Sequence, residues 1–137
     1  MGNDAGGMLL AVSPFAADFS ALQQIFRDSP WRLERCLTRG EACERLERRP
    51  VPVVMCEQEL PDGSWREVLE HTKDQPSPSS LIVTSRLADE RLWSEVLHLG
   101  GYDVLSKPFR QSEVFRVATL AYFYWKNRRM MRAAGRH

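Results

Sequence analysis

The chain has 137 residues, of which 43% are hydrophobic and 27% charged, a composition that fits one ordinary globular domain and excludes a disordered or fibrous protein. Its 19 basic and 18 acidic residues give a net charge of +1, so total charge gives no reason to expect a nucleic-acid or membrane partner. The three cysteines lack Cys-x-x-Cys spacing, which argues against a disulfide framework or zinc site and favours a cytoplasmic location. No apolar run approaches the roughly 20 residues of a membrane helix.

Short apolar runs alternate with helical patterns along the chain. After a glycine-rich lead-in over residues 1–7, strands are expected at 8–12, 31–38, 51–55, 81–84 and 103–105. Helices are expected at 18–26, 41–49, 65–73, 90–99 and 111–131, with Asp18 or Ser20 as the cap of the first. This alternation predicts an α/β protein with a flavodoxin-like (βα)5 fold, a doubly wound parallel sheet in the order 2-1-3-4-5.

The central strand organises the expected site. Its apolar run ends at Glu57, and the chain then turns through Pro61, Asp62 and Gly63. In open α/β sheets, sites form at the carboxyl ends of the strands. With the expected strand order, the strand ends bring one set of residues together: Ser13, Pro14, Glu57, Thr84, Ser85 and Lys107.

Three segments, in this order, resemble the receiver domain of bacterial two-component response regulators, and the resemblance covers about residues 8–125. The first is residues 57–63 (EQELPDG), similar to the family's Asp-x-x-Met/Leu-Pro-x-x-x-Gly segment, whose Asp accepts a phosphoryl group. The second is residues 81–85 (LIVTS), similar to the strand that ends in the family's switch Ser/Thr and a small residue. The third is residues 100–109 (GGYDVLSKPF), similar to Gly-Ala-x-x-Tyr-Leu-x-Lys-Pro-Phe.

The resemblance implies which residues match the family's site and which depart from it. Thr84, followed by Ser85, matches the switch hydroxyl, and Lys107 with Pro108 matches the Lys-Pro pair of the family's motif. The departures are Ser13 and Pro14 in place of a metal-binding acidic pair, Glu57 in place of the acceptor Asp, and Val104 in place of the aromatic switch residue. Losing the acidic pair removes most of the charge that would bind a magnesium ion.

The chain is therefore interpreted as a pseudo-receiver, a non-enzymatic module of phosphorelay signalling that uses no metal and no cofactor. A glutamate is one methylene longer than an aspartate, so Glu57 is expected to pair with Lys107, accept a hydrogen bond from Thr84 and mimic the phosphorylated state. The alternative to this phosphate-mimicking role is that Glu57 forms a purely structural ion pair with Lys107. The alternative function is a working Mg-dependent phosphoacceptor response regulator, with the metal held by Glu57, Glu59 or a further acid.

The last helix suggests a partner surface. Tyr122, Phe123, Tyr124 and Trp125 are successive aromatics about 100° apart, so they cannot all face one core. Tyr122, Phe123 and Trp125 are expected at the interface of a homodimer. The alternative is that they are ordinary surface aromatics. Residues 126–137 form a basic extension that could lead toward an output domain, but no helix-turn-helix follows, so nucleic-acid binding is not expected. The expected partner is a histidine kinase or an output domain or protein.

Overall fold

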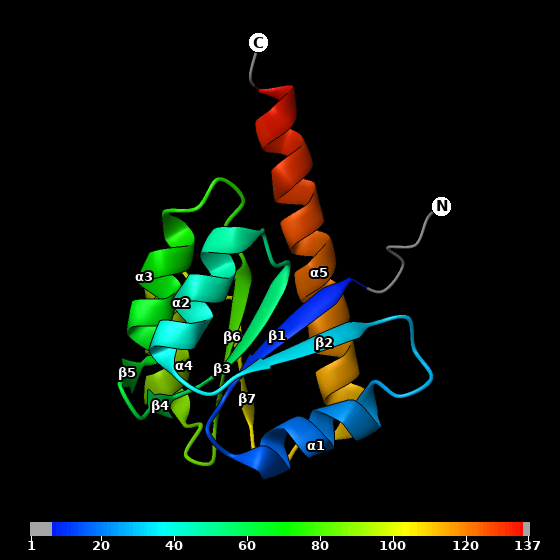
Figure 1. Cartoon of the computed structure of the whole chain (residues 1–137), viewed down its shortest axis with the longest axis vertical. Coiled ribbons are helices and arrows are strands. Elements are labelled where there is room, and N and C mark those ends of the chain that lie inside the picture. Colours follow the sequence, from blue (N-terminus) through cyan, green and yellow to red (C-terminus); the bar gives the residue numbers. More distant parts are fainter. Residues whose placement is uncertain (1–6, 136–137) are drawn as a thin grey trace.

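A five-stranded parallel sheet runs through the computed structural model, which describes residues 7–135 (Figure 1). Its strands are β1 (Met8–Val12), β2 (Arg32–Cys36), β3 (Val53–Glu57), β6 (Ser80–Ser85) and β7 (Asp103–Ser106). The helices of the described chain are α1 (Ala16–Ile25), α2 (Arg39–Arg48), α3 (Trp65–Lys73), α4 (Glu90–Leu99) and α5 (Gln111–Ala134). The strands lie in the order β2-β1-β3-β6-β7, which confirms the predicted flavodoxin-like order.

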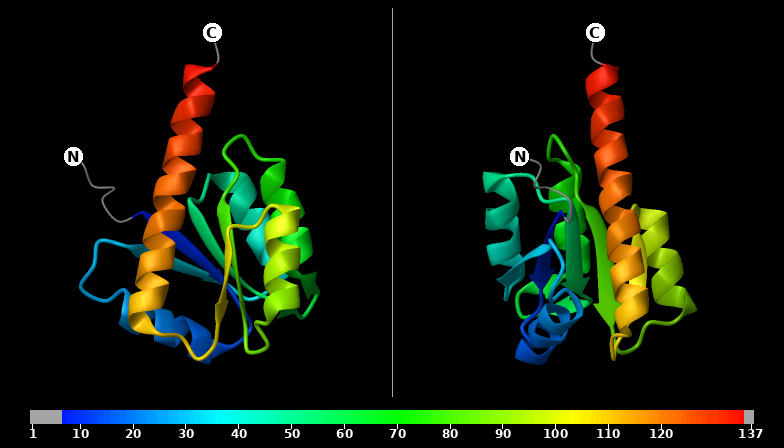
Figure 2. Two further views of the ribbon diagram at one scale, coloured as in Figure 1. Left: turned by 180° about the vertical axis from the view of Figure 1, so that it is seen from behind. Right: turned by 90° about the vertical axis from the view of Figure 1, so that its right-hand side faces the viewer.

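Alternating side chains of the buried strands divide the core into two layers. Leu9 and Val53 face one layer, which α1 and α5 cover, whereas Leu10 and Val54 face the other, which α2, α3 and α4 cover. Seen from behind in Figure 2, α5 crosses one face of the sheet. The near-continuous apolar runs of the central strands thus follow from burial on both faces, as the sequence predicts.

The start of α1 differs from the prediction. This helix begins at Ala16, after a Phe15 cap residue that contributes no side-chain hydrogen bond, so Asp18 and Ser20 lie inside the helix and neither caps it. The carboxylate of Asp18 is engaged elsewhere, in the site described below. Helix α2 begins at Arg39, two residues before the expected start at 41. Thr38 caps it, because its hydroxyl accepts a hydrogen bond from the Glu41 N–H at 3.1 Å.

The chain also contains a small hairpin that the sequence did not predict. Strands β4 (Glu59–Leu60) and β5 (Gly63–Ser64) pair antiparallel across the expected Pro-Asp-Gly turn. Ser64 then caps α3 in a capping box with Glu67. The hairpin therefore connects the end of β3 directly to α3.

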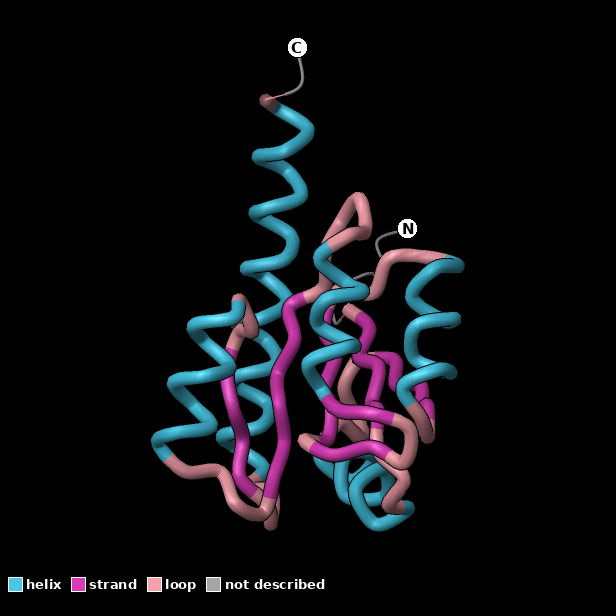
Figure 3. The backbone as a smooth tube through the Cα atoms, turned by 90° about the vertical axis from the view of Figure 1, so that its left-hand side faces the viewer, coloured by secondary structure: helices cyan, strands magenta, loops and turns pink. Residues whose placement is uncertain are grey.

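Helix α5 is longer than predicted and extends well beyond the sheet, as Figures 1 and 3 show. The basic extension is helical up to Ala134. Apart from Gly7, the expected lead-in at 1–7 lies outside the described residues, as do 136 and 137 at the end of the extension. Within the described part of the chain, no helix is both long and apolar enough to span a membrane.

Candidate functional site

Strand register brings the predicted site residues to one end of the sheet. Glu57, the last residue of β3, lies opposite Thr84 on β6, and Ser85 lies opposite Ser106 on β7. The backbone N–H of Lys107 donates to the Ser85 carbonyl at 3.1 Å, so the lysine continues the line of strand ends. The peptide bond between Lys107 and Pro108 is cis. The resemblance to receivers and the register of the sheet thus converge on the same cluster of residues.

The centre of this cluster is a buried lysine that pairs with two carboxylates. The ammonium Nζ of Lys107 lies 2.6 Å from Glu57 Oε1 and 2.9 Å from Asp18 Oδ2. The side chains are 7%, 11% and 13% exposed for Lys107, Glu57 and Asp18, so solvent screens these charges only weakly. The ring of Phe15 lies 4.9 Å from Nζ and covers the ammonium. One cation thus faces two anions in a nearly closed site.

Asp18 is the site residue that sequence reasoning misses. It lies in the first turn of α1, where the helix leaves the carboxyl end of β1. The Ser13 hydroxyl donates to Asp18 Oδ2 at 2.8 Å and accepts from the Phe15 N–H at 3.0 Å. Ser13 therefore orients the carboxylate rather than leaving its position empty. A helix start at Ala16 would have revealed Asp18, because the first turn of α1 borders this edge of the sheet.

Two hydroxyls hold the adjoining strand end. The Thr84 hydroxyl donates to Glu57 Oε1 at 3.3 Å, at the long end of the hydrogen-bond range. The Ser85 hydroxyl donates to Gln58 Oε1 at 2.7 Å and accepts from the Leu87 N–H at 2.9 Å, which ties the segment after β6 to the segment after β3. Val104, which the resemblance places at the family's aromatic switch, is half-buried against the core layer that α2, α3 and α4 cover.

The two buried carboxylates of this site are engaged by an ammonium group rather than free to bind a cation. Magnesium is usually bound by one or two carboxylates with near-octahedral geometry. The resemblance places Ser13 and Pro14 where such ligands would be expected, and the carboxylates of Asp18 and Glu57 both contact Lys107. Glu59 is exposed on β4. Within residues 7–135, no three His, Cys, Asp or Glu side chains cluster in a way that could hold a metal.

Cys56, which precedes Glu57, is a core residue. Its side chain is fully buried, and burial, reinforced by the negative charge of Glu57, raises the pKa of its thiol well above the usual value. A thiol reacts as its thiolate, so Cys56 is held in an unreactive form at neutral pH.

The interface prediction for the last helix is wrong for two of its three residues. Tyr122 and Trp125 are 6% and 7% exposed and belong to the core layer between α5 and the sheet. Phe123 is 49% exposed and points away from that layer. The four aromatics do surround the helix as expected, but the sheet, not a partner, covers two of them.

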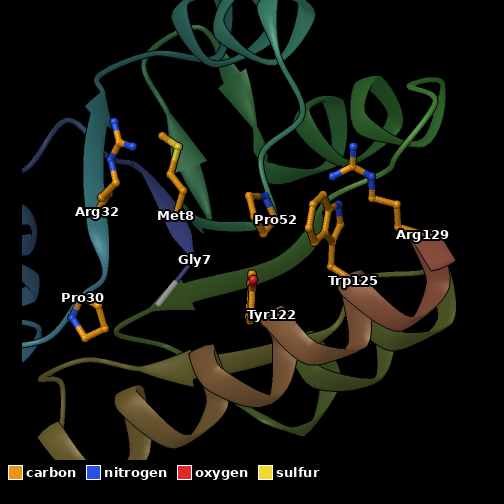
Figure 4. Close-up of a pocket in the computed structure, with 8 residues that line it drawn as sticks. All are labelled: Gly7, Met8, Pro30, Arg32, Pro52, Tyr122, Trp125 and Arg129. Atoms are coloured by element: carbon orange, nitrogen blue, oxygen red, sulfur yellow. The ribbon is translucent and has the colours of Figure 1, made fainter. Parts of the chain in front are cut away.

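A hollow of about 240 Å³ lies at the opposite end of the strands from Glu57 (Figure 4). Tyr122, Trp125 and Arg129 of α5 form one side of it, and residues at or just before the starts of β1, β2 and β3 form the other. The picture shows these α5 side chains directed toward the body of the domain, so they do not lie on the outer side of the helix.

Comparison with known proteins reveals similarity in structure but not in sequence. No family model and no curated protein matches the chain. The signal receiver domain of an HD domain-containing protein from Pseudomonas fluorescens Pf-5 is similar with a TM-score of 0.83 at 22% identity, over 95% of this chain and 96% of that one. The beryllofluoride-activated NtrC4 receiver domain dimer gives 0.79 at 20% identity, over 86% and 98%.

A third similar structure is the receiver domain of a sensor histidine kinase from Pseudomonas aeruginosa PAO1, with a magnesium ion coordinated in its active site cleft. Its TM-score is 0.75 at 19% identity, over 86% of this chain and 98% of that one. Identities this low establish the fold alone. The sheet order, the lysine at the end of β7 and these similarities together show that the chain has the fold of response regulator receiver domains.

Proposed function

We propose that this protein is a receiver-type module of two-component or phosphorelay signalling that acts through protein contacts and does not depend on phosphoryl transfer to residue 57. The observation that carries the proposal is the 2.6 Å pair between Glu57 Oε1 and Lys107 Nζ. Lysine and hydroxyl groups at this position would stabilise a phosphoryl group in a receiver. Here Glu57 supplies the negative charge itself, so Lys107 and Thr84 are engaged without a phosphate.

Two further features support a fixed state. Asp18 also binds Lys107, at 2.9 Å, which leaves the ammonium less able to attract an incoming phosphoryl group. The site holds two carboxylates against one ammonium, and an excess of negative charge repels a phosphate. The metal that would offset this repulsion has no suitable ligand set, because Ser13 and Pro14 replace the acidic pair.

The proposed partners are a histidine kinase or an output domain or protein, together with a second copy of this chain through the last helix. The exposed Phe123 supports self-association, and the similar NtrC4 receiver domain is described as a dimer. No catalytic activity is proposed for the chain. The competing function is a Mg-dependent phosphoacceptor, and one experiment separates the two.

The experiment is intact-mass measurement after incubation with acetyl phosphate and magnesium. We expect no phosphoryl adduct on the unmodified chain or on Glu57→Asp, because the shorter acceptor still lacks a metal site. The matched control is the triple variant Ser13→Asp, Pro14→Asp, Glu57→Asp, which rebuilds the acidic pair and is expected to gain a labile adduct. A labile adduct on the unmodified chain would overturn the proposal. An adduct on Glu57→Asp alone would show that the lost acidic pair is not the block.

A further inference from the structure

Helix α5 presents apolar side chains on two opposite sides. The side toward the sheet holds its buried residues: Val114, Val117, Ala118, Ala121, Tyr122 and Trp125. On the other side, Leu120, Phe123 and Met130 are 50%, 49% and 61% exposed. Since successive helical residues turn by about 100°, one line of residues runs along this outer side. Four residues before Leu120, this line passes through the exposed Arg116; the part after Arg116 carries no charge. We call this uncharged part the outer stripe, and it consists of Leu120, Phe123, Asn127, Met130 and Ala134.

The outer stripe has the spacing of a helix-pairing seam. Its residues follow one another at intervals of three, four, three and four positions, as the a and d positions of a heptad do. The stripe covers about two heptads, or ~22 Å of helix at ~1.5 Å per residue. Such a short seam predicts a weak dimer whose population depends on concentration. Because α5 is already helical where it packs on the sheet, pairing need not nucleate a new helix.

The cations of the same segment are held away from the outer stripe. Arg129 packs over the Trp125 ring at 5.1 Å, and Figure 4 shows it on the domain side of the helix. Arg132 donates to the Pro76 carbonyl at 2.7 Å. Arg128 packs over the ring of Tyr124 at 5.2 Å. A strongly basic segment would repel a copy of itself if these charges lay on the contact, but they lie on the sides and back of the helix.

The remaining cation distinguishes parallel from antiparallel pairing. Lys126 precedes Asn127 and occupies a g position beside the seam, and Met131 occupies the next e position. In a parallel pair, the g residue of one helix meets the following e residue of the other, so Lys126 meets a methionine. In an antiparallel pair centred on Asn127, the two Lys126 side chains would meet, and like charges repel. The charge pattern therefore favours the parallel arrangement.

We propose that the outer stripe pairs in parallel and in register with the outer stripe of a second copy of this chain. Asn127 sets the register, because its amide can bond only to the Asn127 amide of the other copy and would otherwise face apolar side chains. The sheet lies behind each helix, so the two domains are carried on the outside of the pair. This inference deepens the self-association part of the proposed function and does not rest on the state of Glu57.

The first test is sedimentation velocity of the full chain over a wide range of concentration. We expect a dimer that grows with concentration and is lost in Phe123→Lys, which places a charge in the seam. The matched control is Arg132→Lys, which keeps the charge on the back of the helix and should leave the dimer unchanged. Circular dichroism establishes that both variants are folded. A monomer at every concentration, or a dimer unaffected by Phe123→Lys, would overturn the proposal.

The second test establishes orientation by oxidative cross-linking. Asn127→Cys alone would form a disulfide in either orientation, so the test uses Phe123→Cys, Met130→Cys and an equal mixture of the two. Parallel, in-register pairing predicts that each variant links to itself and that mixed links are rare. Predominant mixed links would show antiparallel pairing and refute the assigned arrangement. None of these variants touches Lys107 or Glu57, so failure here is distinct from failure of the phosphoryl-transfer experiment.

Discussion

Replacing Lys107 with methionine should destabilise the fold far more than replacing either of its partners. Methionine fills a similar volume but leaves the carboxylates of Asp18 and Glu57 buried and without their shared cation. Breaking a buried pair by removing one partner costs about 3–5 kcal/mol. Repulsion adds to this cost, since like unit charges ~5 Å apart repel by ~3 kcal/mol at an effective dielectric constant of ~20. We therefore expect Lys107→Met to lower the free energy of unfolding by at least about 3 kcal/mol.

The matched control is Glu57→Gln. It removes one negative charge from a site that holds two carboxylates and one ammonium, and Asp18 continues to pair with Lys107 at 2.9 Å. The amide oxygen of the glutamine can still accept a hydrogen bond, so we expect a loss of about 1 kcal/mol or less. Urea unfolding followed by circular dichroism measures both values. The reasoning is refuted if Lys107→Met costs no more than Glu57→Gln.

Three other predictions concern the core, a helix start and the cysteines. Trp125→Ala should lower the free energy of unfolding by about 3–5 kcal/mol because the indole is buried, whereas Phe123→Ala should cost about 1 kcal/mol or less in urea unfolding; equal costs would contradict the assigned faces of α5. Asp62 accepts from two backbone N–H groups at the start of α2, at 2.7 and 3.0 Å, and these bonds lower the pKa of its carboxyl. A lowered folded-state pKa stabilises the protein above the unfolded pKa, so Asp62→Asn should be less stable at neutral pH. In thermal unfolding across pH, the difference should begin to shrink as the pH falls below about 3.8 and vanish only below the lower folded-state pKa. In a thiol-labelling time course at mildly alkaline pH, half-buried Cys43 should react first and Cys56 only after unfolding, since burial raises the pKa of the Cys56 thiol much further; early labelling of Cys56 would count against this.

Most of the fold could be predicted from the sequence because burial on both faces leaves a strong local signal. The run ending at Met55 and the run ending at Thr84 are apolar at nearly every position, and both form central strands. The first residues of the helices are harder to predict, because several neighbouring polar residues could each act as the N-cap. The β4–β5 hairpin was missed because two-residue strands leave no periodicity.

The site residues at strand ends could be predicted from the sequence, whereas the site residue on a helix could not. Glu57, Thr84 and Lys107 follow directly from the ends of three strands, and the register brings them together. Asp18 lies within a helical pattern, where an acidic residue near the start reads as a cap. The same limit affected α5, because a run of four aromatics does not reveal which two face the sheet, and only packing assigns Tyr122 and Trp125 to the core.

Charged side chains are arranged differently at the two ends of the molecule. In the site, Asp18 and Glu57 converge on Lys107, so charges of opposite sign are brought together and desolvated. Along the exposed end of α5, Arg129 and Arg132 are turned toward aromatic rings and carbonyl groups of their own domain, which leaves an uncharged outer stripe. A module regulated by phosphate needs a site that is open to new charge. A site whose charges are already engaged, joined to a helix whose cations are turned away from its outer side, is what the contact-based function proposed above requires.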